Sequence, residues 1–141
     1  MRGLVHHVVL TVRNPEQCFS LYDSVLTALG YRLERKDERG FGWYLETPTG
    51  SHSIHVARAS EDGAKRLHDR YSPGLHHLAW KVDSRAEVDR MHERLLSVGA
   101  TILDPPAEYP QYNKGCGYYA VFFADADGLK LECVYTPPPS G

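Results

Sequence analysis

Hydrophobic and polar residues alternate in two stretches that resemble each other. The first spans residues 4–14 and reads LVHHVVLTVRN, and the second spans residues 75–84 and reads LHHLAWKVDS. Alternation with a period of two residues predicts a strand with one buried face. Each stretch carries a His-His pair, so His7 and His77 occupy matching positions, 77 − 7 = 70 residues apart. The pattern therefore predicts an internal repeat of two similar modules.

Each of these strands runs into a signal for the start of a helix. Asn14 can cap the first helix, and Pro15 suits its first turn. Ser84 and Glu87 form a capping-box pair at the start of the second helix. Apolar residues at helical spacing follow both signals, and a glycine ends each periodic segment.

Three further strands are predicted after each helix. They are expected at residues 31–35, 42–46, 53–57, 100–103, 118–124 and 129–135. The polar segment 60–71 predicts a short exposed helix, and Pro105 to Gly117 is expected to be a long loop. Each module therefore has the order β-α-β-β-β, which places the chain in the α+β class.

We expect a single domain over residues 1–141, because this length suits one hydrophobic core. Its expected parts are module 1 at about 4–59, a connector at about 60–74, module 2 at about 75–136 and a tail at 137–141.

Composition mainly excludes classes of partner. A net charge of −2 argues against binding nucleic acid, which selects for dense basic patches. No apolar run approaches the roughly 20 residues that a membrane-spanning helix needs. The three cysteines, Cys18, Cys116 and Cys133, form neither a zinc-binding nor a disulfide pattern. We therefore expect a cytoplasmic protein that binds a small molecule.

Strand alternation places four potential metal ligands on faces that point away from the core. They are His7, His55, His77 and Glu132. Three imidazoles and one carboxylate suit a divalent ion such as Zn, Ni, Fe or Mn. The alternative for the histidines is a structural role. A carboxylate between apolar neighbours in a central strand needs a partner, and a metal ion would supply one.

The chain resembles the glyoxalase/bleomycin-resistance/extradiol-dioxygenase group, the vicinal oxygen chelate superfamily. The resemblance rests on HHVVLTV and HHLAWKV as paired opening strands. It also rests on FFADADGLKLECV, which is similar to the family's ending F-x-D-P-D-G-x-x-[IL]-E. It covers nearly the whole chain, and it implies two βαβββ modules whose mixed sheets curl into a cup around a metal ion. The implied ligands lie on the first and last strands of each module, at the same four positions.

Departures from the family pattern narrow the expected activity. Glutathione-dependent glyoxalase I has an arginine where this chain has Thr11, and an asparagine where it has Ala59. His55 replaces a glutamate ligand of that enzyme, so a glutathione-dependent reaction is not expected. An extradiol dioxygenase binds Fe(II) through two histidines and a glutamate, which His7, His77 and Glu132 could supply. No tyrosine is assigned as its catalytic tyrosine, and His55 would be a surplus ligand or a base.

The segment from Glu108 to Tyr119 is rich in tyrosine and glycine, and it is predicted to cover the cup as a lid. Tyr112, Lys114 and Tyr118 are the candidate substrate contacts. The alternative is an ordinary surface loop, although loops of this length in compact domains are often functional.

The overall expectation is a metal-dependent lyase or isomerase that binds two oxygens of a small substrate, with His55 or Glu132 moving the proton. The alternatives are a metal-free drug-binding resistance protein and an Fe(II) extradiol-type dioxygenase. The fold can close one cup within a chain or swap its modules across a homodimer.

Overall fold

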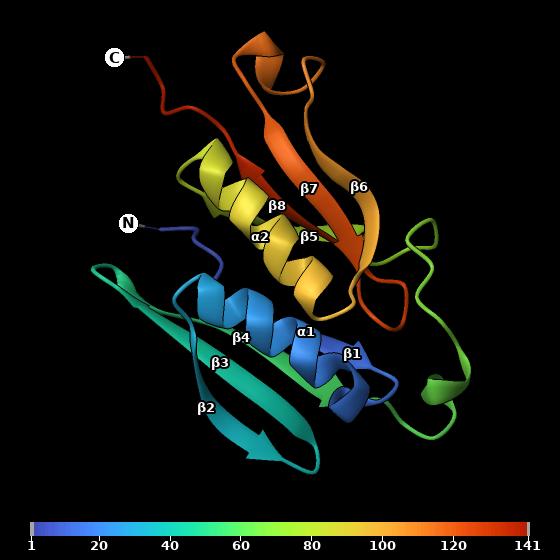
Figure 1. The fold of residues 1–141 in the computed structure, drawn as a ribbon. Helices are drawn as coiled ribbons and strands as arrows, with labels where there is room; N and C mark the ends of the chain where they lie inside the picture. The colour runs from blue at the N-terminus through green and yellow to red at the C-terminus, as the bar shows by residue number, and fades with distance from the viewer. Residues whose placement is uncertain (1, 141) are drawn as a thin grey trace. The chain divides into compact units, whose positions relative to one another are not determined.

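The protein consists of two compact units that meet in the sequence between residues 67 and 68. A computed structural model describes residues 2–140 and is shown in Figure 1. Each unit has the order β-α-β-β-β and contains a four-stranded mixed sheet with one long helix. The predicted α+β class with two βαβββ modules is therefore confirmed. Within the described residues, none of the helices combines the length and the apolar character needed to cross a membrane.

The sheet of the first unit contains one parallel and two antiparallel strand pairs. Its elements are β1 (His7–Val12), α1 (Pro15–Ala28), β2 (Arg32–Asp37), β3 (Gly40–Thr47) and β4 (Gly50–Arg58). The strands lie in the order β1-β4-β3-β2, with β1 parallel to β4. The β4 strand therefore occupies a central place between β1 and β3.

Helix α1 packs its apolar side against the central strands of this sheet. The Asn14 side chain accepts a hydrogen bond from the Glu16 amide, which confirms the predicted cap. Trp43 on β3 is fully buried, and its indole Nε1 donates to Asp23 Oδ1 on α1 at 2.9 Å. Leu26 on α1 is also fully buried. This packing leaves the opposite face of the sheet for the histidines.

The second unit repeats the same plan. Its elements are β5 (His77–Val82), α2 (Arg85–Ser97), β6 (Thr101–Glu108), β7 (Tyr119–Ala124) and β8 (Lys130–Tyr135). The strands lie in the order β5-β8-β7-β6, with β5 parallel to β8. The Ser84 side chain accepts from the Glu87 amide at the start of α2, as the capping-box pattern predicts.

The predicted alternation of faces is present in both opening strands. On β1, Leu10 and Val12 are buried while Thr11 is exposed. On β5, Trp80 and Val82 are buried on either side of an exposed residue. The strand pattern therefore assigned the core-facing side correctly in each module.

The helix predicted over residues 60–71 is wrong. This segment contains only a single 3-10 turn, η1 (Gly63–Lys65). Its main apolar residue, Leu67, is exposed, so a helix would have no apolar face to bury. Short side chains bind the local backbone instead: Ser60 Oγ accepts from the Gly63 amide, and Asp69 Oδ1 accepts from the Tyr71 amide.

The loop predicted from Pro105 to Gly117 is shorter than expected. Strand β6 continues through two prolines to Glu108, and a 3-10 turn, η2 (Asn113–Gly115), follows. Proline is tolerated because β6 is the edge strand of its sheet, and its pairing with β7 shifts register between Asp104 and Ala107.

Candidate functional site

The first pair of predicted ligands lies on adjacent strands of the first unit. His7 begins β1, and His55 lies on the neighbouring strand β4. Their imidazole rings meet edge to face, with ring centroids 6.4 Å apart. The structure therefore brings His7 and His55 together on the sheet face opposite α1.

The His55 ring is in close contact with neighbouring residues on this face of the sheet. Its Nε2 and Ser53 Oγ share a hydrogen bond of 3.0 Å. Gly42 lies directly beneath the ring, and a Cβ there would come within 2.8 Å of His55 Nδ1. Tyr44 meets the same ring edge to face at 5.4 Å. The imidazole is therefore held by contacts on several sides.

The charge state of His55 follows from these surroundings. Loss of solvent lowers the pKa of this imidazole, and the electrostatic interactions with Arg35 and His7 lower it further. His55 is therefore a neutral imidazole at neutral pH. A neutral imidazole can accept a proton or bind a metal ion.

The second pair of predicted ligands lies in the second unit. Glu132 is only 1% exposed, although it is a carboxylate in the central strand β8. Its Oε1 lies 3.3 Å from His77 Nε2. Two ligand atoms that each lie about 2.1 Å from a tetrahedral ion are separated by roughly 3.4 Å. The His77–Glu132 pair therefore fits the ligand spacing of a divalent metal site.

The second carboxylate oxygen of Glu132 also has a protein partner. The Tyr118 hydroxyl donates a short hydrogen bond to Glu132 Oε2. Burial raises the pKa of Tyr118 far above its ordinary value, and the hydrogen bond to Glu132 raises it further. Tyr118 therefore remains a protonated phenol that orients the carboxylate.

Both His-His pairs share the same internal geometry. His6 Nδ1 and His7 Nδ1 are 2.9 Å apart, and the Nδ1 atoms of His76 and His77 are 2.8 Å apart. In each pair one ring must donate and the other accept. When His7 and His77 donate, each keeps the lone pair of its Nε2 for a metal ion, as ligating histidines usually do.

The four predicted ligands lie as two pairs, one in each unit. Across residues 2–140, the structure assembles no group of three His, Cys, Asp or Glu side chains that could hold a metal ion. The donor set is nevertheless appropriate, because each unit contributes a pair of adjacent groups that bind divalent ions well.

Two of the three predicted substrate contacts belong to an aromatic cluster in the second unit. The aromatic cluster consists of Tyr109, Tyr112, Tyr118 and Phe122. Tyr109 stacks on Tyr112 with ring centroids 5.7 Å apart, and it meets Phe122 edge to face at 5.4 Å. Lys114 lies instead in the exposed η2 turn, with a positive φ of 54°. The structure therefore groups Tyr112 and Tyr118 near Glu132, but it does not show Lys114 in this cluster.

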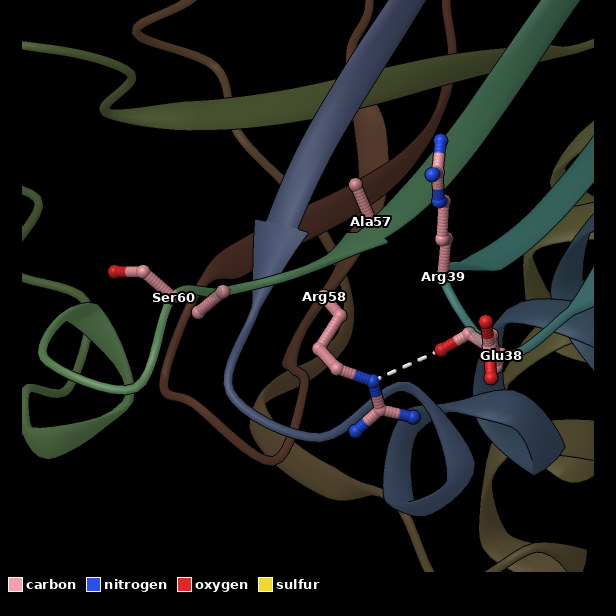
Figure 2. A pocket seen from close by; sticks show the side chains of 6 residues that line it. Glu38, Arg39, Ala57, Arg58 and Ser60 are labelled. Atoms are coloured by element: carbon pink, nitrogen blue, oxygen red, sulfur yellow. Dashed lines mark hydrogen bonds between the residues drawn. The ribbon is translucent and has the colours of Figure 1, made fainter.

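A pocket of about 670 Å³ lies at one end of the first unit's sheet, as Figure 2 shows. The Arg58 side chain in its wall donates from Nε to the Glu38 carbonyl oxygen at 2.9 Å and forms an ion pair with Glu16. Arg39 points in a different direction from Arg58 (Figure 2). None of the four predicted ligands lines this pocket, so we assign no function to it.

Several residues of the site were not singled out in the sequence. Ser53 is buried and is the register partner of His7, and it lies two residues before His55 on the same face. The period of two could have identified it. Tyr109 and Phe122 lie far apart in the chain, and only the pairing of β6 with β7 brings their rings together. No local pattern indicates that contact.

Comparison with known proteins gives the same family from sequence and from structure. A sequence profile of the Glyoxalase/Bleomycin resistance protein/Dioxygenase superfamily matches residues 4–133. An uncharacterised protein of Bacillus subtilis (strain 168), YqjT, is 30% identical over 130 residues, which cover 92% of this chain and 97% of that protein.

Solved structures extend this similarity to the fold. A proposed glyoxalase from Bacillus halodurans is 28% identical, with a TM-score of 0.78 and coverage of 95% of this chain and 96% of that chain. A glyoxylase/bleomycin resistance protein/dioxygenase domain from Frankia sp. EAN1pec is 26% identical, with a TM-score of 0.68 and coverage of 96% and 99%. Because the profile spans almost the entire chain and both βαβββ modules are present, this protein belongs to the glyoxalase/bleomycin resistance protein/dioxygenase superfamily.

Proposed function

We propose that this protein is a metal-dependent enzyme that acts on a small molecule through two adjacent oxygen atoms. His7, His77 and Glu132 are its metal ligands, and His55 is either a fourth ligand or the base. The observation that carries this proposal is Glu132, a carboxylate that is 1% exposed and lies 3.3 Å from His77 Nε2. Tyr118 donates to one oxygen of this carboxylate, and a cation bound beside the other oxygen would stabilise its negative charge in the buried site.

A divalent ion at these ligands would act as a Lewis acid and stabilise negative charge that develops on the substrate oxygens. Tyr118 orients Glu132 through its hydroxyl, so that Glu132 Oε1 keeps its place beside His77. These contacts order the second unit's ligands before any ion binds.

His55 is the group best suited to move a proton. Its lowered pKa keeps the imidazole neutral at neutral pH, and its hydrogen bond to Ser53 fixes the direction of the ring. An isomerase or lyase reaction of this kind needs a base that removes a proton from the carbon next to the oxygen whose negative charge is stabilised. Thr11 and Ala59 stand where glutathione-dependent glyoxalase I has an arginine and an asparagine, so glutathione is not the proposed cosubstrate.

A second candidate is an Fe(II) extradiol-type dioxygenase. The hydrogen bond between His55 Nε2 and Ser53 favours His55 as a base and leaves His7, His77 and Glu132 as ligands. Two histidines and one carboxylate are the ligand set of non-haem Fe(II) oxygenases. Oxygen consumption with catechol in the Fe(II)-loaded protein would distinguish this activity from a lyase or isomerase reaction.

The proposal is tested by measuring metal content by mass spectrometry in protein purified without a nickel column. Glu132→Gln keeps the shape of the buried side chain but removes its negative charge. Glu108→Gln is the matched control, because Glu108 is a carboxylate of the same unit that is exposed and paired with Arg85. We expect bound metal in the native chain and in the Glu108 variant, and its loss from the Glu132 variant.

The opposite result would also be informative. A native chain that binds no metal after incubation with Zn, Ni, Fe and Mn would overturn the proposed enzyme. The remaining explanation would then be a metal-free protein that binds an apolar or aromatic drug.

A further inference from the structure

A lysine lies beside the proposed metal ligands of the second unit. Lys130 is the register partner of His77 across the parallel β5–β8 pair, and it precedes Glu132 by two residues. Side chains two residues apart on a strand lie on the same face, as do those of register partners. Lys130, His77 and Glu132 therefore share one face of the sheet.

Within the part of the chain that the structure describes, no acidic side chain forms an ion pair with this lysine. Among residues 2–140, none of the ion pairs includes Lys130. Glu132 Oε2 accepts from the Tyr118 hydroxyl, and Glu132 Oε1 lies 3.3 Å from His77 Nε2. Asp104 on β6 is the register partner of Phe122, but it forms no ion pair with Lys130 among the described residues. The ammonium group of Lys130 is therefore available to an external anion.

The same lysine lies over the buried Phe122 ring at the edge of the aromatic cluster. Lys130 Nζ lies 4.4 Å from the centroid of the Phe122 ring, and Phe122 is the register partner of Glu132 across β7 and β8. Tyr109 meets Phe122 edge to face, and Tyr118 meets Tyr112 in the same way at 5.1 Å. A cation, an aromatic face and a proposed metal ligand thus occupy neighbouring positions.

We propose that Lys130 and the aromatic cluster form a subsite for a planar carboxylic acid. The carboxylate of the substrate binds the Lys130 ammonium, and its conjugated part lies against Tyr109 and the exposed ring of Tyr112. This inference deepens the proposed function and rests on it, because it names the class of substrate whose adjacent oxygens the ion would bind. Charge-assisted hydrogen bonds and ring contacts together select planar acids over neutral or non-planar compounds.

The test uses the metal-free full chain, so that binding at the subsite is measured separately from metal binding. Benzoate is the probe, benzamide is its neutral counterpart, and cyclohexanecarboxylate is a non-planar acid. Amide chemical shifts in NMR titrations locate each probe and give its dissociation constant. We expect benzoate to shift the signals of Phe122 and Lys130 and to bind more tightly than either comparison compound.

Lys130→Gln should weaken benzoate binding about tenfold and leave benzamide binding unchanged, because only the charged contact is lost. Lys130→Arg should retain most of the benzoate affinity. Lys36→Gln is the matched control, because Lys36 also lies over a phenylalanine ring, with its Nζ 4.8 Å from the Phe19 centroid, but in the other unit.

Equal benzoate affinity in the native and Lys130→Gln proteins would overturn the subsite, as would shifts confined to other strands. A native protein that shows Lys130-dependent benzoate binding but holds no metal would support the subsite and contradict the metal-dependent function. The two proposals can therefore fail independently.

Discussion

The protonation of His55 depends on its burial and on side chains from two other strands. Desolvation, Arg35 on β2 and His7 on β1 all favour the neutral ring, so the pKa of His55 is lowered. Protonation of this ring therefore opposes folding. The contribution of His55 to stability is present above the ordinary imidazole pKa, and it is lost as the pH falls through the lowered value.

Replacing Arg35 by glutamine should raise the pKa of His55 towards its ordinary value, because it removes a positive charge that disfavours the imidazolium. NMR titration of the His55 ring protons in the metal-free protein measures this change. Arg32→Gln is the control, since Arg32 on the same strand forms an exposed pair with Glu34 at 2.9 Å. An unchanged His55 pKa in the Arg35 variant would show that Arg35 does not affect the site.

His76 is expected to act on the metal site through its neighbour. The 2.8 Å hydrogen bond between the Nδ1 atoms of His76 and His77 fixes the orientation of the His77 ring and favours one of its two tautomers. His76→Phe should therefore lower metal affinity about 10- to 100-fold and mix the His77 tautomers seen in ¹⁵N NMR spectra. His92→Phe, on α2, should change neither measurement. If the ratio of His77 tautomers were the same in the His76 variant as in the native protein, this role of His76 would be contradicted.

At the scale of elements, the pairing of β3 with β4 determines which residue packs beneath the His55 ring. Gly42 and Gly40 both lie on β3, but an added Cβ would meet different neighbours. At Gly42 it would lie 2.8 Å from a side-chain atom of His55, and at Gly40 it would lie 1.8 Å from the backbone carbonyl oxygen of Val56. Gly40 also has a φ of 147°, which disfavours any side chain.

Alanine substitutions at these glycines should therefore have unequal effects. Gly42→Ala should cost about 1 kcal/mol of unfolding free energy and displace the His55 NMR signals, because a side chain can move aside. Gly40→Ala should cost roughly 3 kcal/mol or more, because backbone cannot yield in the same way. Denaturant unfolding measures both values. Similar losses in the two variants would refute this reading of the strand pair.

Over the whole molecule, the proposed ligands are divided between two compact units. The proposed ligand set of His7, His77 and Glu132 therefore includes residues of both units. Metal binding should then stabilise both units together. A ligand at 100 times its dissociation constant stabilises the folded state by about 2.7 kcal/mol.

Hydrogen exchange can measure this coupling unit by unit. Added metal should increase the protection of amides in β4 and in β8, and Glu132→Gln should abolish the increase in both strands. Protection gained only in β8 would show that the ion binds within the second unit alone. Light scattering of the same samples would establish whether one chain or two copies hold the ion.

The sequence predicted those parts of the protein that depend on local patterns. Period-two alternation in LVHHVVLTV and LHHLAWKV correctly separated the buried faces from the histidine faces. The pattern failed at residues 60–71, where side chains that bind the local backbone outweigh a weak helical signal. It also failed at Pro105, because local rules cannot reveal that a strand lies at an edge.

What the sequence by itself determined is the repeat, the α+β class and the candidate ligands, because strand alternation and helix caps are set by neighbours in the chain. Which aromatic residue of β3 faces the histidines was decided only by the tertiary structure. Trp43 is buried against α1 and Tyr44 contacts His55. The contacts of Glu132 with Tyr118 and of Lys130 with Phe122 likewise depend on strand pairing. Strand pairing brings together residues that are distant in sequence, through burial and hydrogen bonding across the sheet. The residues next to each of them in the chain do not indicate which strands pair.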